Sequence, residues 1–248
     1  MMINRIQQDL DGQGFTVGSW LNLGSPLAAE VMVSVGFGWL CVDAEHGPIG
    51  LSEVTHLIRA IESRGGTPIV RIPDHDSATI GRILDAGALG IVAPHVRTEQ
   101  EARHIARSCR YTPRGHRSAG SGRAITLSAN YEEQINDHIV VIAQIEDREG
   151  IKNSAAIVGV DGIDIGFLGP KDLSLEMDEP MGSPEHEQAM AQLLVACKQV
   201  GKPAGIPIAN GTDLANRRQQ GFVFFDLTSD LRMLQHRAAA ELKVAMGK

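Results

Sequence analysis

The chain has 248 residues, of which 43% are hydrophobic, so one large core is expected and we predict a single domain over residues 1–248. Its formal charge of −7 argues against nucleic acid or an acidic membrane surface as a partner and favours small-molecule substrates. Three cysteines without metal-ligand spacing, together with an N-terminal segment that lacks a signal-peptide core, predict a cytoplasmic protein with free thiols.

Short apolar runs rich in β-branched residues recur along the chain, and each is followed by a stretch with helical periodicity. In chain order, the predicted strands span residues 16–21, 39–45, 67–73, 90–96, 138–146, 162–169, 202–209 and 222–229. Helices are expected, among others, over residues 52–63, 99–109 and 230–246. Eight such repeats in about 250 residues are typical of an α/β fold, the (β/α)8 or TIM barrel. A doubly wound sheet would usually carry a glycine-rich nucleotide fingerprint, which the sequence lacks.

Polar and titratable residues follow the predicted strands, whereas the strands themselves are apolar. In chain order, these residues are Asp43, Glu45, His46, Arg71, His95, Gln144, Glu146 and Asp172. Active sites of (β/α)8 barrels lie at the carboxyl ends of the strands. The sequence therefore predicts an active site at this end of the barrel.

Two carboxylates follow neighbouring predicted strands, Glu146 at the end of one and Asp172 after the next. Because adjacent strands are only about 5 Å apart, both can approach one point, where two like charges favour a cation between them. Oxygen ligands of this kind suit Mg²⁺ or Mn²⁺. The alternative is structural: Glu146 pairs with an arginine, and Asp172 caps a short helix that begins in "KDLS".

Asp43 and His46 are three residues apart, so the carboxylate can orient the imidazole and increase its basicity, as in a general base. The alternative is a rim histidine satisfied by the local backbone. Arg71 ends an apolar strand, and its permanent charge needs an anion or a developing oxyanion nearby. Both a substrate role and an ion pair with Glu45 or Asp85 remain open.

Residues 103–123 hold an unusual density of arginines for an acidic protein, and we expect most of them to be solvated or at subunit contacts. Arg117 and Arg123 lie in the glycine-rich segment "RGHRSAGSGRA" and are the candidates to meet an anionic substrate tail. No phosphate-loop signature follows these glycines. We assign no function to His75, His95 or His138, or to Cys41.

Six motifs, in order, resemble those of the HpcH/HpaI aldolase family, which comprises metal-dependent pyruvate aldolases acting on 4-hydroxy-2-oxo acids. They are "WLCVDAEHGP", "TPIVRIP", "LDAGALGIVAPHV", "RYTPRGHRS", "QIEDREGIKN" and "VDGIDIGFLGPKDLS". The resemblance extends from Trp20 to about Asp230. It implies a (β/α)8 barrel, a divalent metal (Mg²⁺ or Mn²⁺, with Co²⁺ as a further candidate) on Glu146 and Asp172, and pyruvate or hydroxypyruvate plus an aldehyde as substrates.

The resemblance also implies roles for individual residues. His46 with Asp43 acts as the base, Arg71 holds the keto oxygen, and Asp85 of "ILDAGA" assists the base. Independently of the resemblance, we expect Gln144, Lys171 and Asp172 to take part in substrate binding. A homo-oligomer is implied as well, a hexamer whose subunits exchange the C-terminal helix.

The expected chemistry is reversible aldol cleavage through a metal-stabilised enolate, with His46 removing the methyl proton of pyruvate and backbone amides near Lys171 binding its carboxylate. Ser118 stands where family members often have glycine, and Lys171 occupies a variable position, so the preferred aldehyde is left open. Two other interpretations are a Schiff-base aldolase that uses Lys171 and a non-catalytic binding barrel.

Overall fold

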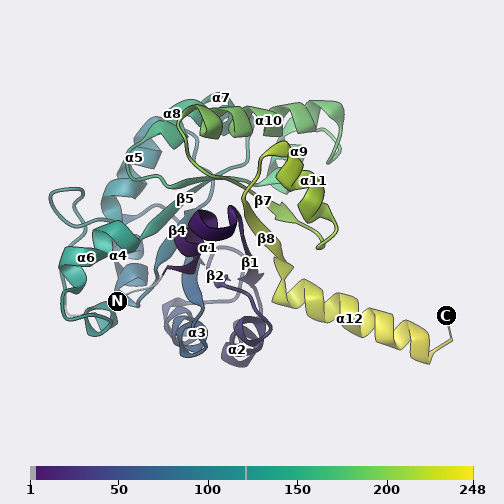
Figure 1. Cartoon of the computed structure of the whole chain (residues 1–248), viewed down its shortest axis with the longest axis horizontal. Helices are drawn as coiled ribbons and strands as arrows, with labels where there is room; N and C mark the ends of the chain where they lie inside the picture. The colour runs from purple at the N-terminus through teal and green to yellow at the C-terminus, as the bar shows by residue number, and fades with distance from the viewer. Residues whose placement is uncertain (1–3, 121, 248) are drawn as a thin grey trace.

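The computed structural model describes residues 4–120 and 122–247, and its eight parallel strands close into a barrel in the order β1 to β8 (Figure 1). The strands are β1 (Thr16–Leu21), β2 (Trp39–Asp43), β3 (Thr67–Arg71), β4 (Gly90–Ala93), β5 (Val140–Ile145), β6 (Ile165–Leu168), β7 (Ala204–Ile208) and β8 (Phe224–Ser229). The predicted (β/α)8 fold is confirmed. A single domain over 1–248 stays a prediction, and residues 1–3, 121 and 248 lie outside the described residues.

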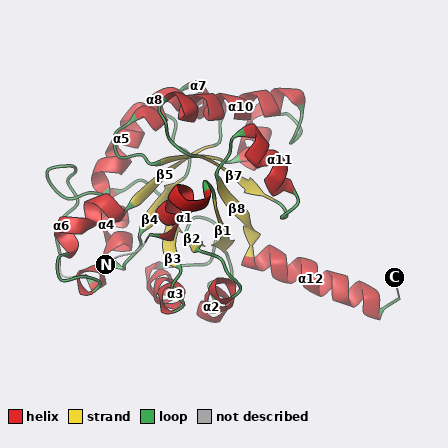
Figure 2. Ribbon diagram, viewed as in Figure 1, coloured by secondary structure: helices red, strands yellow, loops and turns green. Residues whose placement is uncertain are grey.

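Helices surround the barrel and alternate with its strands (Figure 2). They are α1 (Arg5–Gln13), α2 (Pro26–Ser34), α3 (Leu51–Ser63), α4 (Ser77–Asp85), α5 (Glu99–Ser108), the 3₁₀ helix η1 (Arg123–Thr126), α6 (Tyr131–His138), α7 (Arg148–Lys152), α8 (Ser154–Gly159), α9 (Pro170–Met177), α10 (Pro184–Gln199), α11 (Asp213–Gln220) and α12 (Asp230–Ala245). The three helices named from the sequence end within one residue of their predicted bounds.

The amino end of the barrel is filled by apolar side chains. Ile6 of α1 is fully buried with the interior strand residues, and α1 lies across this opening in Figure 1. The rings of Trp39 and Phe224 stack with centroids 4.4 Å apart. This packing requires Gly18, because a Cβ there would lie 2.0 Å from the Trp39 ring. With the amino end closed in this way, the interior is left accessible from the carboxyl ends of the strands.

The last helix, α12, extends away from the barrel instead of packing on it (Figure 1). Its first turn is fixed: Ser229 Oγ accepts a hydrogen bond from the Arg232 N–H, and the buried Asp230 accepts the backbone N–H of Asn22 at 2.8 Å. Beyond this turn its apolar side chains are exposed, among them Leu242 at 64%. Within residues 4–120 and 122–247, no helix has the length and apolar character needed to cross a membrane.

Candidate active site

A cavity of about 470 Å³ lies at the carboxyl ends of the strands, a volume typical of small-molecule sites. Its polar lining comes from several strands and from α9 and α12. These polar residues are Asn22, Arg71, Gln144, Lys171, Asp172, Asp226, Thr228, Ser229, Arg232 and His236. The sequence-predicted residues Arg71, Gln144, Lys171 and Asp172 therefore share one cavity.

Arg71 is held in a fixed orientation at this cavity. Strands β2 and β3 pair in a register that sets Asp43 opposite Arg71. As a result, Arg71 donates from Nε to Asp43 Oδ1 at 2.9 Å and from Nη2 to Oδ2 at 2.6 Å. Its guanidinium lies 4.3 Å from the centroid of the Trp20 ring, and Nε is 3.2 Å from Glu45 Oε2. Of the two ion-pair partners considered from the sequence, Glu45 is present, whereas Asp85 is not.

Asp43 is fully buried, and both of its oxygens are occupied. Besides Arg71, it accepts the Asn22 side-chain amide at 2.7 Å and the backbone N–H groups of Glu45 and His46 at 3.2 Å each. Burial raises the pKa of Asp43, but Arg71 and the two N–H groups outweigh burial and leave the pKa below its ordinary value. The predicted contact between Asp43 and the His46 ring is not formed, because Asp43 binds the His46 backbone.

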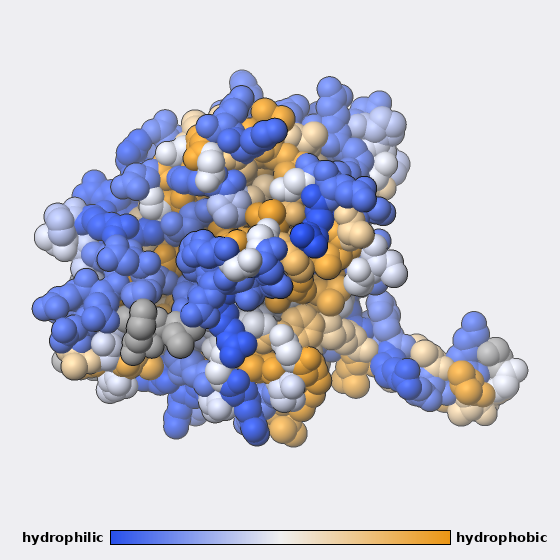
Figure 3. Space-filling view, viewed as in Figure 1, coloured by the Kyte–Doolittle hydropathy of each residue, from blue (hydrophilic) through white to orange (hydrophobic). Residues whose placement is uncertain are grey.

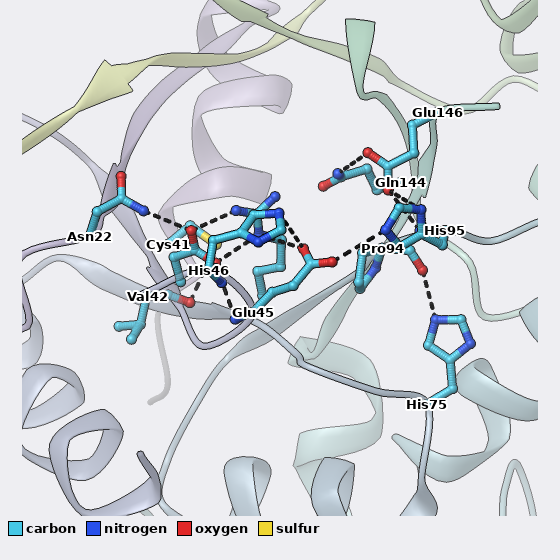
Figure 4. Close-up of polar contacts among 12 residues, drawn as sticks. Asn22, Cys41, Val42, Glu45, His46, His75, Pro94, His95, Gln144 and Glu146 are labelled. Atoms are coloured by element: carbon cyan, nitrogen blue, oxygen red, sulfur yellow. Dashed lines mark hydrogen bonds and ion pairs between the residues drawn. The ribbon is translucent and has the colours of Figure 1, made fainter. Parts of the chain in front are cut away.

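The His46 ring instead lies beside Glu45, with Nε2 3.6 Å from Glu45 Oε2 (Figure 4). Its side chain is 63% exposed, whereas that of Glu45 is only 12% exposed. Glu45 also contacts a second imidazole, since its Oε1 is 3.4 Å from His95 Nε2. One carboxylate thus lies between two histidines and next to Arg71.

The sequence analysis assigned no function to His95, but it connects two of the candidate residues. Its backbone N–H donates to Glu146 Oε1 at 2.8 Å, and its ring Nδ1 is 3.2 Å from the same oxygen. His95 has a φ of 51°, a left-handed conformation that is uncommon for residues other than glycine. The preceding carbonyl, that of Pro94, contacts His75 Nε2 at 2.7 Å. Such strain is concentrated at functional sites, and here it brings the ring between Glu45 and Glu146.

Glu146 is more buried than Asp172, the other carboxylate of the predicted metal pair, and only 1% of its side chain is exposed. Gln144 Nε2 donates to its Oε2 at 2.6 Å. A Cβ at Gly169 would lie 2.2 Å from that oxygen, so only glycine fits beside Glu146. Burial and, to a smaller extent, the charge of Asp172 raise the pKa of Glu146, whereas the hydrogen bonds from Gln144 and His95 lower it. The pKa ends above its ordinary value.

The donors at this place suit a hard divalent cation. Glu146 and Asp172 interact electrostatically, and Gln144 Oε1 is buried without a hydrogen-bond partner among the described residues. Carboxylate and amide oxygens are the ligands that Mg²⁺ and Mn²⁺ prefer. No group of three or more His, Cys, Asp or Glu residues is arranged around a common point in the described part of the chain. The protein therefore offers two carboxylates, and water or substrate oxygens would supply the remaining ligands of such an ion.

Asp85 does not join this cluster. It ends α4, which runs from the carboxyl end of β3 towards the amino end of β4, so it lies at the opposite end of the barrel from His46. There it accepts a hydrogen bond from Arg117 Nη2 at 2.6 Å. Arg117 is buried under Tyr131, and Arg123 pairs with Glu62. Assistance of His46 by Asp85 within this chain is thus ruled out by position, and neither arginine lies in the cavity.

Three titratable or charged residues of the cavity lining, Asp226, Arg232 and His236, were missed by the sequence analysis. Asp226 of β8 is buried, its Oδ1 has no hydrogen-bond partner among the described residues, and burial raises its pKa well above the ordinary value. Its position inside the apolar run "FVFFDLTS" was the available signal. Arg232 and His236 reach the cavity from α12. No local pattern indicates this, because it depends on the direction in which α12 leaves the barrel.

A family model described as HpcH/HpaI aldolase/citrate lyase matches residues 16–237. The chain belongs to this family. It is 36% identical over 238 residues to the 4-hydroxy-2-oxo-heptane-1,7-dioate aldolase of Escherichia coli strain ATCC 8739, covering 93% of this chain and 90% of the relative. It is 35% identical over 243 residues to the 2-dehydro-3,6-dideoxy-6-sulfogluconate aldolase of Pseudomonas putida, covering 96% of this chain and 94% of the relative.

Solved structures agree with this assignment. A crystal structure of a HpcH/HpaI aldolase/citrate lyase family protein from Burkholderia cenocepacia J2315 superposes with a TM-score of 0.93 at 32% identity, covering 98% of this chain and all of the other. The resemblance seen in the sequence motifs is thus confirmed. The protein is an aldolase, a carbon–carbon lyase whose substrates are small molecules, in a family that is generally metal-dependent.

Proposed function

We propose that this aldolase is of class II and reversibly cleaves 4-hydroxy-2-oxo acids into an aldehyde and pyruvate or hydroxypyruvate. The observation that carries the proposal is that Arg71 and Asp172 line one carboxyl-end cavity, and that Glu146 lies beside it, in contact with the cavity residue Gln144 and within electrostatic range of Asp172. A cation site and a fixed guanidinium are what is needed where a keto oxygen gains negative charge. The known relatives support the aldolase class, while the substrate of this chain is our inference.

Glu146 and Asp172 would hold the divalent cation, and Gln144 Oε1 is available beside them. Mg²⁺ and Mn²⁺ are the candidates, with Co²⁺ as a third. When bound, such an ion would act as a Lewis acid on the keto group of the substrate. His95 keeps Glu146 in place through its backbone N–H, so that the carboxylate is oriented before any ligand arrives.

Arg71 is the proposed donor to the keto oxygen. Its Nε and Nη2 are occupied by Asp43, and none of the hydrogen bonds of the described residues uses Nη1. The Asp43 fork and the stacking on Trp20 prevent the guanidinium from reorienting. A donor fixed in advance stabilises developing charge without reorganisation during the reaction.

His46 is the proposed base that removes the methyl proton of pyruvate, and the exposed side of its ring makes it accessible. Glu45, not Asp43, is the carboxylate beside the ring. Asp43 contributes indirectly, because it binds both Arg71 and the backbone N–H of His46. The backbone N–H groups around Lys171 and Asp172 open α9, where a helix N-terminus favours the substrate carboxylate.

The Schiff-base alternative requires Lys171 as an uncharged amine. Its side chain is exposed and adjacent to Asp172, whereas amine nucleophiles are activated by apolar surroundings or a neighbouring cation. We therefore favour the metal-dependent chemistry. Membership of an aldolase family argues against the non-catalytic barrel.

We also propose a homo-oligomer in which α12 packs on another copy, as in a hexamer with exchanged helices. Besides α12, helix α2 and its C-cap carry exposed apolar residues at helical spacing, Leu27 and Val31 in the helix and Val35 at the cap. Figure 3 shows hydrophobic surface on the side of the barrel near the base of α12. Burial of such surface is the usual driving force for association. Three buried free thiols are consistent with the proposed cytoplasmic location.

The decisive experiment measures aldol cleavage and the exchange of pyruvate methyl protons with deuterated water. We expect EDTA to abolish both and Mg²⁺ or Mn²⁺ to restore them. Glu146→Gln and Asp172→Asn should weaken metal binding and abolish both reactions. Glu176→Gln is a matched control, because Glu176 is an exposed carboxylate of the same helix as Asp172 and pairs with Arg148. Activity that survives exhaustive chelation, or pyruvate fixed to Lys171 by borohydride, would contradict the proposal.

A further inference from the structure

The peptide bond between Pro94 and His95 is held from both of its sides. On one side, the His95 N–H donates to Glu146 Oε1 at 2.8 Å. On the other side, the Pro94 carbonyl oxygen lies 2.7 Å from His75 Nε2, and Figure 4 shows His75 and Glu146 on opposite sides of this bond. Because the N–H and C=O of a planar trans peptide point in opposite directions, the two contacts fix one orientation of the peptide plane.

His75 is the donor in its contact with Pro94. A carbonyl oxygen only accepts hydrogen bonds, so the ring of His75 carries a proton on Nε2. The loop that bears His75 joins β3 to α4 and is itself anchored. The Ile72 N–H donates to the Val92 carbonyl at 3.0 Å, and His104 Nε2 lies 2.9 Å from the His75 carbonyl oxygen. The donor therefore reaches Pro94 from a segment that is fixed at its backbone.

The orientation in which the peptide is held is strained. His95 has a φ of 51°, in the left-handed region that costs energy for a residue with a Cβ atom. Rotation of the peptide plane between Pro94 and His95 changes this φ, and a half-turn would return it to the extended region. The strain thus favours rotation of the peptide, whereas the hydrogen bonds to His75 and Glu146 oppose it.

Rotation of this peptide would change the surroundings of Glu146. In the structure, the buried carboxylate accepts the His95 N–H at Oε1 and the Gln144 amide at Oε2. After a half-turn, the Pro94 carbonyl oxygen would point towards Glu146 in place of the N–H, and the two oxygens would repel each other. Glu146 would lose both a donor and its fixed orientation.

We propose that His75 is a positioning residue for the metal-binding carboxylate: it holds the Pro94 carbonyl and so keeps the His95 N–H directed at Glu146 before a cation binds. This inference rests on the proposed function, in which Glu146 holds the divalent cation. His75 is not among the residues that line the cavity, so it acts through the peptide and not on the substrate.

The size of the effect follows from the role of the contact. Removing a group that orients a metal-binding side chain typically lowers metal affinity about 10- to 100-fold. His75 acts through one peptide bond, and Gln144 continues to hold Glu146, so we expect a loss near the lower end of this range. The loss should concern metal binding, because Arg71 keeps its own contacts with Asp43.

The test is a calorimetric titration of the substrate-free protein with Mn²⁺. His75→Leu removes the donor, and His75→Asn shortens the side chain so that its amide does not reach Pro94. Both should bind Mn²⁺ about tenfold more weakly than the wild type. His75→Gln keeps an N–H donor at a similar distance from the backbone and should bind nearly as the wild type does. His56→Leu, which replaces an exposed histidine of α3, is the matched control and should have no effect.

The catalytic readout separates positioning from a general loss of structure. In His75→Leu, exchange of pyruvate methyl protons should fall at limiting Mn²⁺ and return to nearly the wild-type rate at saturating Mn²⁺. Urea unfolding checks that each variant is folded, and His75→Asn decides the outcome if His75→Leu does not fold. Wild-type Mn²⁺ affinity in the folded variants that lack the donor, or an equal loss in His75→Gln, would overturn the positioning role.

A last readout needs no metal and so separates this inference from the proposed function. Hydrogen–deuterium exchange of the His95 amide, followed by NMR in the metal-free protein, reports whether the N–H stays bonded to Glu146. The amide should be protected in the wild type and in His75→Gln and should exchange faster in His75→Leu. Equal protection in all three would contradict the inference. Absence of Mn²⁺ binding by the wild type would instead overturn the proposed function.

Discussion

Replacing Arg71 by alanine tests two proposed roles of this side chain at once. It pairs with the buried Asp43, and it is the proposed donor to the keto oxygen of the substrate. The change removes hydrogen bonds of 2.9 and 2.6 Å to Asp43, the ion pair with Glu45 and the stacking on Trp20. We expect a loss of turnover and a loss of stability, and each can be assigned a size.

The catalytic loss is that of one preorganised donor to a developing oxyanion, about 100- to 1000-fold in kcat. The loss of stability arises at Asp43, which stays buried with only the Asn22 amide and two backbone N–H groups. Breaking a buried ion pair from one side costs about 3–5 kcal/mol. Adding Asp43→Asn to Arg71→Ala should restore part of the stability and none of the activity. Arg71→Lys should retain more of both, although a point charge cannot reproduce the fork.

The pH dependence of stability should reverse in Arg71→Ala. In the wild type the pKa of Asp43 is lowered, so its contribution is present above the unfolded value of about 3.9 and is lost as pH falls through the folded pKa. Without Arg71, burial dominates and raises that pKa above the unfolded value. The folded state then binds more protons than the unfolded state, and the site favours folding more at acidic pH.

Urea unfolding between pH 4 and pH 8, together with kcat for pyruvate and an aldehyde, measures both effects. The free energy of unfolding of Arg71→Ala, relative to wild type, should improve as pH falls. Wild-type turnover in the alanine variant would show that Arg71 is only an ion-pair partner. An unchanged difference in stability across this range would refute the role given to the buried Asp43.

Three further predictions concern the metal, the strained turn and the assembly. Glu146→Gln should lower Mn²⁺ affinity in a calorimetric titration, and Glu176→Gln should not. His95→Gly removes the ring and relieves the left-handed strain but keeps the N–H that binds Glu146. We therefore expect unchanged or slightly greater stability in urea and a slower exchange of pyruvate protons. Exchange at the wild-type rate would show that the ring has no role in the reaction. Light scattering should return a mass several times 26.6 kDa for the wild type and a smaller mass for Leu242→Glu, and a wild-type value near 26.6 kDa would rule out the oligomer.

The fold could be predicted because its signals are local. Strands of a parallel barrel are buried on both faces, so they appear as continuous apolar runs, and all eight were recognised. Helix α5 begins where Thr98 caps it and Glu101 closes the capping box, a pattern visible in the sequence alone. The direction of α12 was not predictable in this way, because the Thr228 corner and the Asp230 contacts with β1 determine it.

The same difference between local signals and long-range contacts explains which site residues could be predicted. The strand-end rule identified Arg71, Gln144 and Glu146, since a residue's place at a strand end is a local property. The partner of Asp43 was misassigned, because the β2–β3 register, which connects residues 28 positions apart, brings it to Arg71 instead of the His46 ring. The left-handed turn at His95 carries no sequence signal, because glycine and asparagine are the residues expected there.

Two buried polar atoms at the site lower the stability of the folded protein. The protein itself gives no hydrogen-bond partner to Gln144 Oε1 or Asp226 Oδ1, although both are buried within the described part of the chain. Each buried polar atom left in this way costs about 1–3 kcal/mol. A fold selected for stability alone would carry apolar residues at these positions, because they would pack without this penalty. Both residues line the same cavity as Arg71, so a ligand or a water molecule in that cavity can supply the missing hydrogen bonds and offset this penalty.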